Sequence, residues 1–132
     1  MRVGFLGLGD MGEIIVPRLI DAGYQVTGWN RTLEKAKPLA DKGMAVGDSP
    51  ADVAAKSDVI FSIVTDAAAV EAVALGENGV LSGIAKDSVY IDMSTISPGR
   101  SRAISTAFRD AGRIMLDGPL SGSPVSIVQK IG

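Results

Sequence analysis

The sequence predicts an α/β fold in which helices cover both faces of a doubly wound, mostly parallel sheet. Short apolar runs alternate along the 132 residues with helix-like stretches, and short connections join them. Strands that alternate with helices pair in parallel, and right-handed crossovers then leave a doubly wound sheet as the simplest arrangement. A hydrophobic fraction of 46% and a charged fraction of 21% give this sheet a normal core in one domain.

The expected strands are apolar runs bounded by turn-forming residues. In chain order they cover residues 3–6, 24–30, 44–46, 59–64, 89–93 and 113–116. Residues 59–64, Val-Ile-Phe-Ser-Ile-Val, form the clearest buried strand, whereas residues 44–46 are a short strand at best. Six strand candidates fit a sheet built from two βαβαβ halves.

The expected helices lie between these strands, and several carry a recognisable start. They cover residues 11–22, 33–42, 67–74 and 98–111, with a further helix beginning at Pro50. Ser49 and Ser97 are hydroxyl caps followed by proline, and Thr32 can cap the second helix. Pro17 is expected to kink the first helix or to shift its start. Residues 76–83 contain turn formers.

Composition excludes several classes of function. The chain has 13 basic and 15 acidic residues, a formal charge of −2, which excludes a strongly basic nucleic-acid binder. It contains neither cysteine nor histidine, so disulfides, thiol nucleophiles and histidine-based triads or metal sites are excluded, and no metal is expected. Neither a signal peptide nor a membrane span is visible, so the expected compartment is the cytoplasm and no membrane partner is expected.

A glycine motif follows the first expected strand. Gly7-Leu8-Gly9-Asp10-Met11-Gly12 matches G-x-G-x-x-G and opens a helix, which is the context of a dinucleotide-binding turn. Gly7 permits the tight turn, Gly9 lets the backbone approach a pyrophosphate, and Gly12 lets helix and strand pack closely. Amide groups at the positive end of the helix then hold the phosphates of a Rossmann-type domain. The alternative is a glycine-rich turn without a ligand.

The end of the second expected strand indicates which dinucleotide is bound. It reads Trp29-Asn30-Arg31-Thr32, without the acid that usually marks an NAD site about 20 residues after the glycines. Arg31 can pair with a 2′-phosphate, and Asn30 and Thr32 can donate hydrogen bonds without adding negative charge. NADP is therefore predicted in preference to NAD. The alternative is a surface arginine followed by an ordinary threonine cap.

Taken with these motifs, the chain resembles the β-hydroxyacid dehydrogenases. Residues 4–12 resemble the opening of 3-hydroxyisobutyrate dehydrogenase, 2-hydroxy-3-oxopropionate reductase, glyoxylate/succinic semialdehyde reductases and, more distantly, 6-phosphogluconate dehydrogenase. Residues 30–32 resemble those of NADP-preferring members, and residues 92–98 resemble the segment near the nicotinamide. Residues 117–123 resemble the substrate motif D-A-P-V-S-G-G, with Gly and Leu at its second and fourth positions. Beyond residue 123 the sequence leaves the family pattern.

The resemblance implies hydride transfer between NADP(H) and a small 3-hydroxy acid or its semialdehyde. It implies that Val64-Thr65-Asp66 lines the cofactor cleft and that Thr95 contacts the cofactor near its nicotinamide ribose. It also implies that Ser121 and Gly122 hold the carboxylate of a small substrate. Thr95 can alternatively be a polar residue at a helix start, and Ser121 an ordinary turn residue.

The catalytic lysine of this family lies in a second, all-helical half, and no position here matches its motif. Residues 1–132 are therefore expected to be a single NADP-binding domain, a truncated chain with no catalytic residue and no turnover of its own. The face that the helical half would cover is expected to cause homo-oligomerisation. The alternatives are a non-catalytic NADP(H)-sensing module and the N-terminal domain of an imine reductase-like enzyme.

Overall fold

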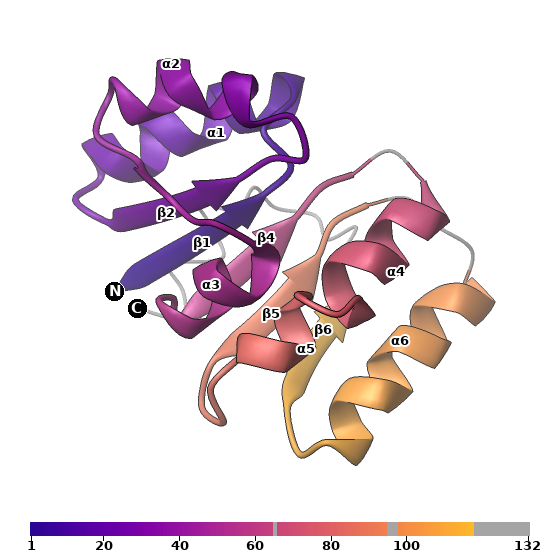
Figure 1. Cartoon of the computed structure of the whole chain (residues 1–132). Coiled ribbons are helices and arrows are strands. Elements are labelled where there is room, and N and C mark those ends of the chain that lie inside the picture. Colours follow the sequence, from indigo (N-terminus) through magenta and orange to yellow (C-terminus); the bar gives the residue numbers. More distant parts are fainter. Residues whose placement is uncertain (65, 95–97, 118–132) are drawn as a thin grey trace.

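A computed structural model describes residues 1–64, 66–94 and 98–117, and these form a parallel sheet with helices on both faces (Figure 1). The six strands lie in the order β3-β2-β1-β4-β5-β6, and every neighbouring pair is parallel. They are β1 (Arg2–Leu6), β2 (Gln25–Trp29), β3 (Ala45–Val46), β4 (Val59–Ser62), β5 (Val89–Asp92) and β6 (Ile114–Asp117). The predicted doubly wound sheet is confirmed.

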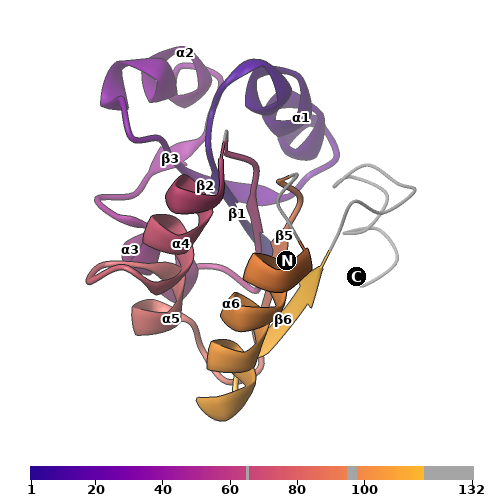
Figure 2. The ribbon, with the colours of Figure 1, turned by 90° about the vertical axis from the view of Figure 1, so that its right-hand side faces the viewer.

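The helices divide the core into two layers, one on each face of the sheet. They are α1 (Asp10–Asp21), the 3₁₀ helix η1 (Leu33–Ala36), α2 (Lys37–Ala40), α3 (Pro50–Ala55), α4 (Ala67–Leu75), α5 (Val80–Gly83) and α6 (Pro98–Asp110). Figure 2 shows α1 and α4 on opposite sides of the strands. Alternation along the strands assigns the faces, because Phe5 and Phe61 pack with α1 while Leu6, Ile60 and Tyr90 pack with α3, α4 and α6.

Two expectations for the helices were wrong in detail, and a third was tested only in part. α1 begins at Asp10, after Gly9 as its N-cap, and continues through Pro17, so the proline does not shift its start, whereas the kink expected as the alternative stays a prediction. Thr32 precedes η1, and its carbonyl accepts the N–H of Lys35 at 3.1 Å, but its hydroxyl makes no cap bond. Residues 80–83 form α5 where only turns were expected.

The expected cap at Ser49 is confirmed, whereas the expected end of the fourth strand is not. The hydroxyl of Ser49 accepts the backbone N–H of Asp52 at 3.1 Å and caps α3. β4 ends at Ser62, two residues before the expected end, so that residues 63 and 64 leave the sheet. The expected cap at Ser97 lies outside the described residues.

An ion pair joins the amino ends of β1 and β4, away from the cavity described below. The carboxylate of Asp58 accepts the backbone N–H of Arg2 at 2.8 Å and a guanidinium N–H of Arg2 at 3.2 Å. These bonds, the backbone one first, hold the pKa of Asp58 below its usual value. Both side chains are about half exposed, so the pair contributes little stability at neutral pH.

In the described part of the chain, no helix is both long enough and apolar enough to cross a membrane.

Candidate cofactor site

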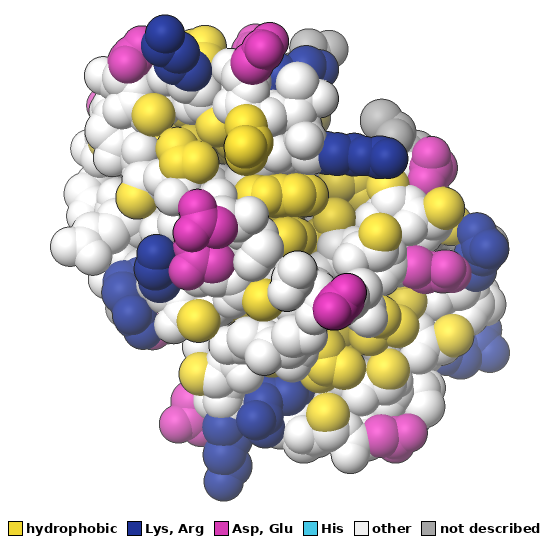
Figure 3. All heavy atoms as spheres, viewed as in Figure 1, with side chains coloured by type: hydrophobic (Ala, Val, Ile, Leu, Met, Phe, Trp, Pro, Cys, Tyr) yellow, Lys and Arg dark blue, Asp and Glu magenta, His cyan; other side chains and the backbone are white. Residues whose placement is uncertain are grey.

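A cavity of about 780 Å³ opens at the carboxyl ends of the strands, beside the point where the chain passes from the β1–β2 side of the sheet to β4. In parallel sheets this switch point is the usual place for a ligand. Figure 3 shows hydrophobic side chains gathered in the hollow at the middle of the face that is also seen in Figure 1. The described lining is Gly7, Gly9, Trp29, Asn30, Arg31, Lys35, Pro50, Ile63, Val64, Asp66, Ala68, Ala69, Ala72, Val73, Gly76, Glu77 and Asn78.

The glycine loop forms one end of this cavity, and each glycine has a distinct environment. Gly7 has a φ of +94°, and a Cβ there would overlap the carbonyl oxygen of Ile63. Gly9 has extended backbone, and a Cβ there would have no heavy atom within 4 Å. At Gly12 a Cβ would lie 3.1 Å from the carbonyl oxygen of Gly7, so α1 packs closely on the loop. The open side of the loop is therefore at Gly9.

Asn30 ties the glycine loop to the end of β2. Its Oδ1 accepts the N–H of Leu8 at 2.8 Å, and its Nδ2 donates to the carbonyl of Thr32 at 3.0 Å. The side chain of Leu8 is fully buried and its backbone N–H is bonded to Asn30, so neither the side chain nor the N–H faces the cavity. The amides left for an anion are those of Gly9 and the first turn of α1, which have no partner within the helix.

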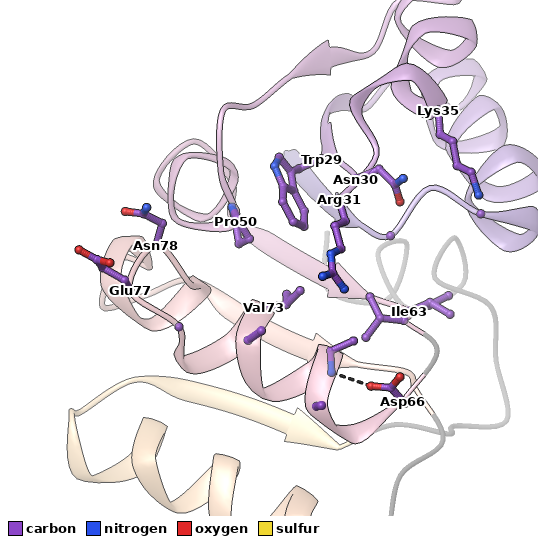
Figure 4. A pocket seen from close by; sticks show the side chains of 17 residues that line it. Trp29, Asn30, Arg31, Lys35, Pro50, Ile63, Asp66, Val73, Glu77 and Asn78 are labelled. Carbon is purple, nitrogen blue, oxygen red and sulfur yellow. Dashed lines mark hydrogen bonds between the residues drawn. The ribbon is translucent and has the colours of Figure 1, made fainter.

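Two cations stand at the cavity wall that follows β2. Arg31 is exposed and points into the cavity, with the half-buried Trp29 beside it (Figure 4). Lys35, four residues later in η1, also lines the cavity, although sequence reasoning did not single it out. Thr32 is not part of the described lining.

The opposite wall is α4, whose residues line the cavity along its whole length. Asp66 caps this helix, its Oδ1 accepting the N–H of Ala69 at 2.8 Å (Figure 4). Alanines at 68, 69 and 72 leave a wall without bulky side chains. A flat ring can therefore be accommodated between α4 and Arg31, with the cation of Arg31 at its edge.

A buried polar network lies behind the cavity, at the carboxyl ends of β4 and β5. Ser62 is fully buried, and its hydroxyl contacts the hydroxyl of Tyr90 at 2.6 Å and the carboxylate of Asp92 at 2.8 Å. The same Asp92 oxygen accepts the N–H of Ser94 at 3.1 Å, and the hydroxyl of Ser94 accepts the N–H of Val64 at 2.8 Å. Burial above all, and then the charge of Asp92, raise the pKa of Tyr90, so its hydroxyl stays protonated.

Comparison with known proteins defines the family. The family model described as the NAD binding domain of 6-phosphogluconate dehydrogenase matches residues 2–129. The chain belongs to this family. The predicted resemblance is thereby confirmed for an NAD(P)-binding domain of hydroxyacid dehydrogenase-like oxidoreductases.

Two curated relatives of this NAD-binding domain illustrate its range. The cytokine-like nuclear factor N-PAC of Danio rerio is 41% identical over 122 residues, which cover 92% of this chain and 26% of that protein. Glyoxylate/succinic semialdehyde reductase 2 of Arabidopsis thaliana, a chloroplastic protein, is 40% identical over 123 residues, which cover 93% of this chain and 34% of that protein. The chain thus spans about a quarter to a third of their length.

Solved structures share the fold of this NAD-binding domain. The 3-hydroxyisobutyrate dehydrogenase of Mycobacterium tuberculosis, solved with L-serine, superposes with a TM-score of 0.81 at 30% identity, over 92% of this chain and 41% of that chain. The imine reductase of Myxococcus stipitatus, solved with NADP⁺, gives a TM-score of 0.82 at 27% identity, over 95% and 42% of the two chains.

Four expected site residues of this NAD-binding domain lie outside the described residues, namely Thr65, Thr95, Ser121 and Gly122. Of the glycine motif, Asp10 opens α1 with its backbone, and Met11 is about half exposed on the helix surface. No group of three or more acidic residues within the described ranges is placed to hold a metal ion.

Proposed function

We propose that this domain binds NADPH in preference to NADH. The observation that carries the proposal is that Arg31 and Lys35 both line the cavity at the end of β2, where an NAD site usually has an acid. Hydrogen bonds from charged donors are each worth about 1.5–3 kcal/mol, so two cations favour the nucleotide with the extra phosphate.

The residues present fit such a cofactor. The open space at Gly9 and the amides of the first turn of α1 would receive the pyrophosphate. Arg31 and Lys35 would hold the 2′-phosphate, and the alanine-rich face of α4 would lie along the cofactor. Bound in this way, NADP(H) would supply or accept a hydride, while the protein holds and orients it.

The proposed reaction of the whole enzyme interconverts a small 3-hydroxy acid and its semialdehyde or oxo acid. It is supported by the family resemblance and by relatives named as a semialdehyde reductase and a 3-hydroxyisobutyrate dehydrogenase. Ser121 and Gly122 would hold the substrate carboxylate. The 132-residue chain would not turn over alone, because no residue in it matches the family's catalytic lysine. The proposal includes a cytoplasmic location, which cell fractionation tests.

A second candidate is a binding module without catalysis, and an imine reductase-like enzyme is a third. The binding module is favoured by the identity to a protein named as a nuclear factor. The imine reductase-like enzyme is favoured by the superposition on an imine reductase. Assays with a longer chain that includes a helical half would separate them. Reduction of a semialdehyde supports the hydroxyacid reaction, reduction of a cyclic imine supports the third candidate, and cofactor binding without turnover supports the module.

Parallel calorimetric titrations with NADPH and NADH test the cofactor proposal. NADPH should bind more tightly, and Arg31→Asp should weaken NADPH binding more than about tenfold while affecting NADH less. Arg102→Asp is the matched control, because it makes the same charge change on the exposed surface of α6, outside the cavity lining. Equal losses for both nucleotides in Arg31→Asp would refute the 2′-phosphate contact.

A further inference from the structure

We propose that Ser94, held by Asp92 and through it by Ser62 and Tyr90, is a positioning residue for the nicotinamide half of the cofactor. It acts through Val64, whose backbone it fixes where β4 leaves the sheet. This inference rests on the proposed function, since it assigns a task to one wall of the same cavity.

The hydrogen bonds of this network converge on the carboxylate of Asp92. Ser62 donates its hydroxyl proton to Asp92, so the hydroxyl of Tyr90 must be the donor in the 2.6 Å contact with Ser62. Asp92 then accepts a second bond from the N–H of Ser94. The four side chains are at most 7% exposed, so each bond is made in an environment where leaving a group unpaired is costly.

Val64 is the point where this network meets the cavity. The backbone N–H of Ile63 still bonds to the carbonyl of Leu6 at 3.0 Å, in continuation of the β1–β4 ladder. The next amide, that of Val64, is bonded to the hydroxyl of Ser94 instead. Val64 lines the cavity, and a Cβ at Gly7 would lie 3.2 Å from its side chain, so this wall adjoins the glycine loop.

The position of the network on the sheet indicates which half of the cofactor it serves. In a sheet of two mononucleotide-binding halves, β1 and β2 carry the loops for the adenosine half, and the strands beyond β1 receive the other half. Val64 and Ser94 follow β4 and β5, on that other side. The network therefore supports the wall for the nicotinamide half, while Arg31 and Lys35 stand on the adenosine side.

A second buried serine, at the opposite end of β5, makes a matched control possible. Ser88 is 5% exposed, and its hydroxyl donates to the carbonyl of Ser57 at 2.9 Å. Like Ser94, it makes one bond between the segments that flank β4 and β5. It precedes β5 at the amino end, away from the cavity, so that Ser88→Ala removes a comparable buried bond without touching the proposed site.

The experiment compares two ligands on Ser94→Ala, Ser88→Ala and the unchanged chain. The ligands are NADPH and adenosine 2′,5′-bisphosphate, which carries the 2′-phosphate but no nicotinamide. Ser94→Ala should weaken NADPH binding by roughly fivefold to tenfold, the range expected for losing one buried hydrogen bond, with bisphosphate binding within about twofold of the unchanged chain. Ser88→Ala should leave both affinities unchanged. The protection of the Val64 amide against hydrogen exchange, measured with NADPH bound, should fall only in Ser94→Ala.

Each outcome decides between the two proposals. If the unchanged chain binds both ligands and Ser94→Ala behaves like Ser88→Ala, the positioning inference is overturned while the cofactor proposal stands. Equal losses for NADPH and the bisphosphate in Ser94→Ala would also overturn it, because they would show a general loss of structure. If the unchanged chain binds neither ligand, the proposed function fails and the inference falls with it.

Discussion

Replacing Gly7 with alanine should unfold the domain far more readily than replacing Gly9, although both belong to one motif. At Gly7 a φ of +94° costs an L-residue about 1–2 kcal/mol. The new methyl would also overlap the carbonyl oxygen of Ile63 and stand 3.0 Å from its carbon, which forces β1 and β4 apart. Filling an occupied space typically costs a further ~1–3 kcal/mol.

The expected total for Gly7→Ala is about 2–5 kcal/mol, a large part of the 5–15 kcal/mol that stabilises an ordinary domain. A loss of 1 kcal/mol lowers Tm by about 3–5 °C in a domain of this size, so the variant should melt about 6–25 °C below the unchanged chain. Urea titration followed by circular dichroism measures the same loss as a free energy of unfolding.

Gly9→Ala is the matched comparison, because its methyl would have no heavy atom within 4 Å. Its stability cost should be at most about 1 kcal/mol, the difference between glycine and alanine at an N-cap. Its NADPH affinity, however, should fall more than about tenfold, since the methyl occupies the side of the loop proposed for the pyrophosphate. A Gly7→Ala variant as stable as the unchanged chain would refute the steric reasoning, and undiminished NADPH binding by Gly9→Ala would refute the placement of the pyrophosphate.

Four further outcomes are expected. Trp29 is the chain's one tryptophan and lines the cavity, so NADPH should quench its fluorescence, and Trp29→Phe should lose the signal but keep calorimetric binding. Ser49→Ala should cost about 1 kcal/mol in urea titrations because a cap bond is lost, whereas Thr32→Ala, without such a bond, should cost less than about 0.5 kcal/mol. Because the pKa of Asp58 is lowered in the folded state, its ionised carboxylate stabilises the fold above pH ~4, and this stabilisation is lost as the pH falls through the folded pKa. The small advantage in the free energy of unfolding over Asp58→Asn should therefore disappear in acid. An advantage that stays constant with pH would contradict the linkage. Leu116, 47% exposed on the edge strand β6, should promote self-association, and Leu116→Lys should reduce the particle mass in light scattering; a monomeric unchanged chain would contradict this.

The strands were predictable from sequence because buried parallel strands are apolar on both faces. Residues 59–62 show this most clearly, since all four are buried. The helix α5 was not predictable, because four residues ending in Ser82 and Gly83 carry no helical periodicity. Its formation depends on tertiary contact, as a Cβ at Gly83 would overlap the backbone of Ala51 in α3.

The candidate site was predictable where one local motif contains its residues. Arg31 follows directly from the end of β2, and Gly9 from the glycine motif. Lys35 depends on the direction in which η1 leaves the strand, which no local pattern specifies. The bond from Leu8 to Asn30 joins residues 22 positions apart, so it became visible only when the loop and the strand end were brought together.

Because Asn30 holds the glycine loop, the route by which nucleotide preference can change is constrained. An acid at the end of the second strand is the usual means of favouring NAD. At position 30 an aspartate would keep an acceptor for the N–H of Leu8 but lose the donor to Thr32, and it would bring a negative charge beside the loop proposed for phosphates. Positions 31 and 35 carry no such tie to the loop amides. Substitutions at positions 31 and 35, natural or engineered, can therefore change the nucleotide preference separately, while the geometry of the glycine loop stays the same.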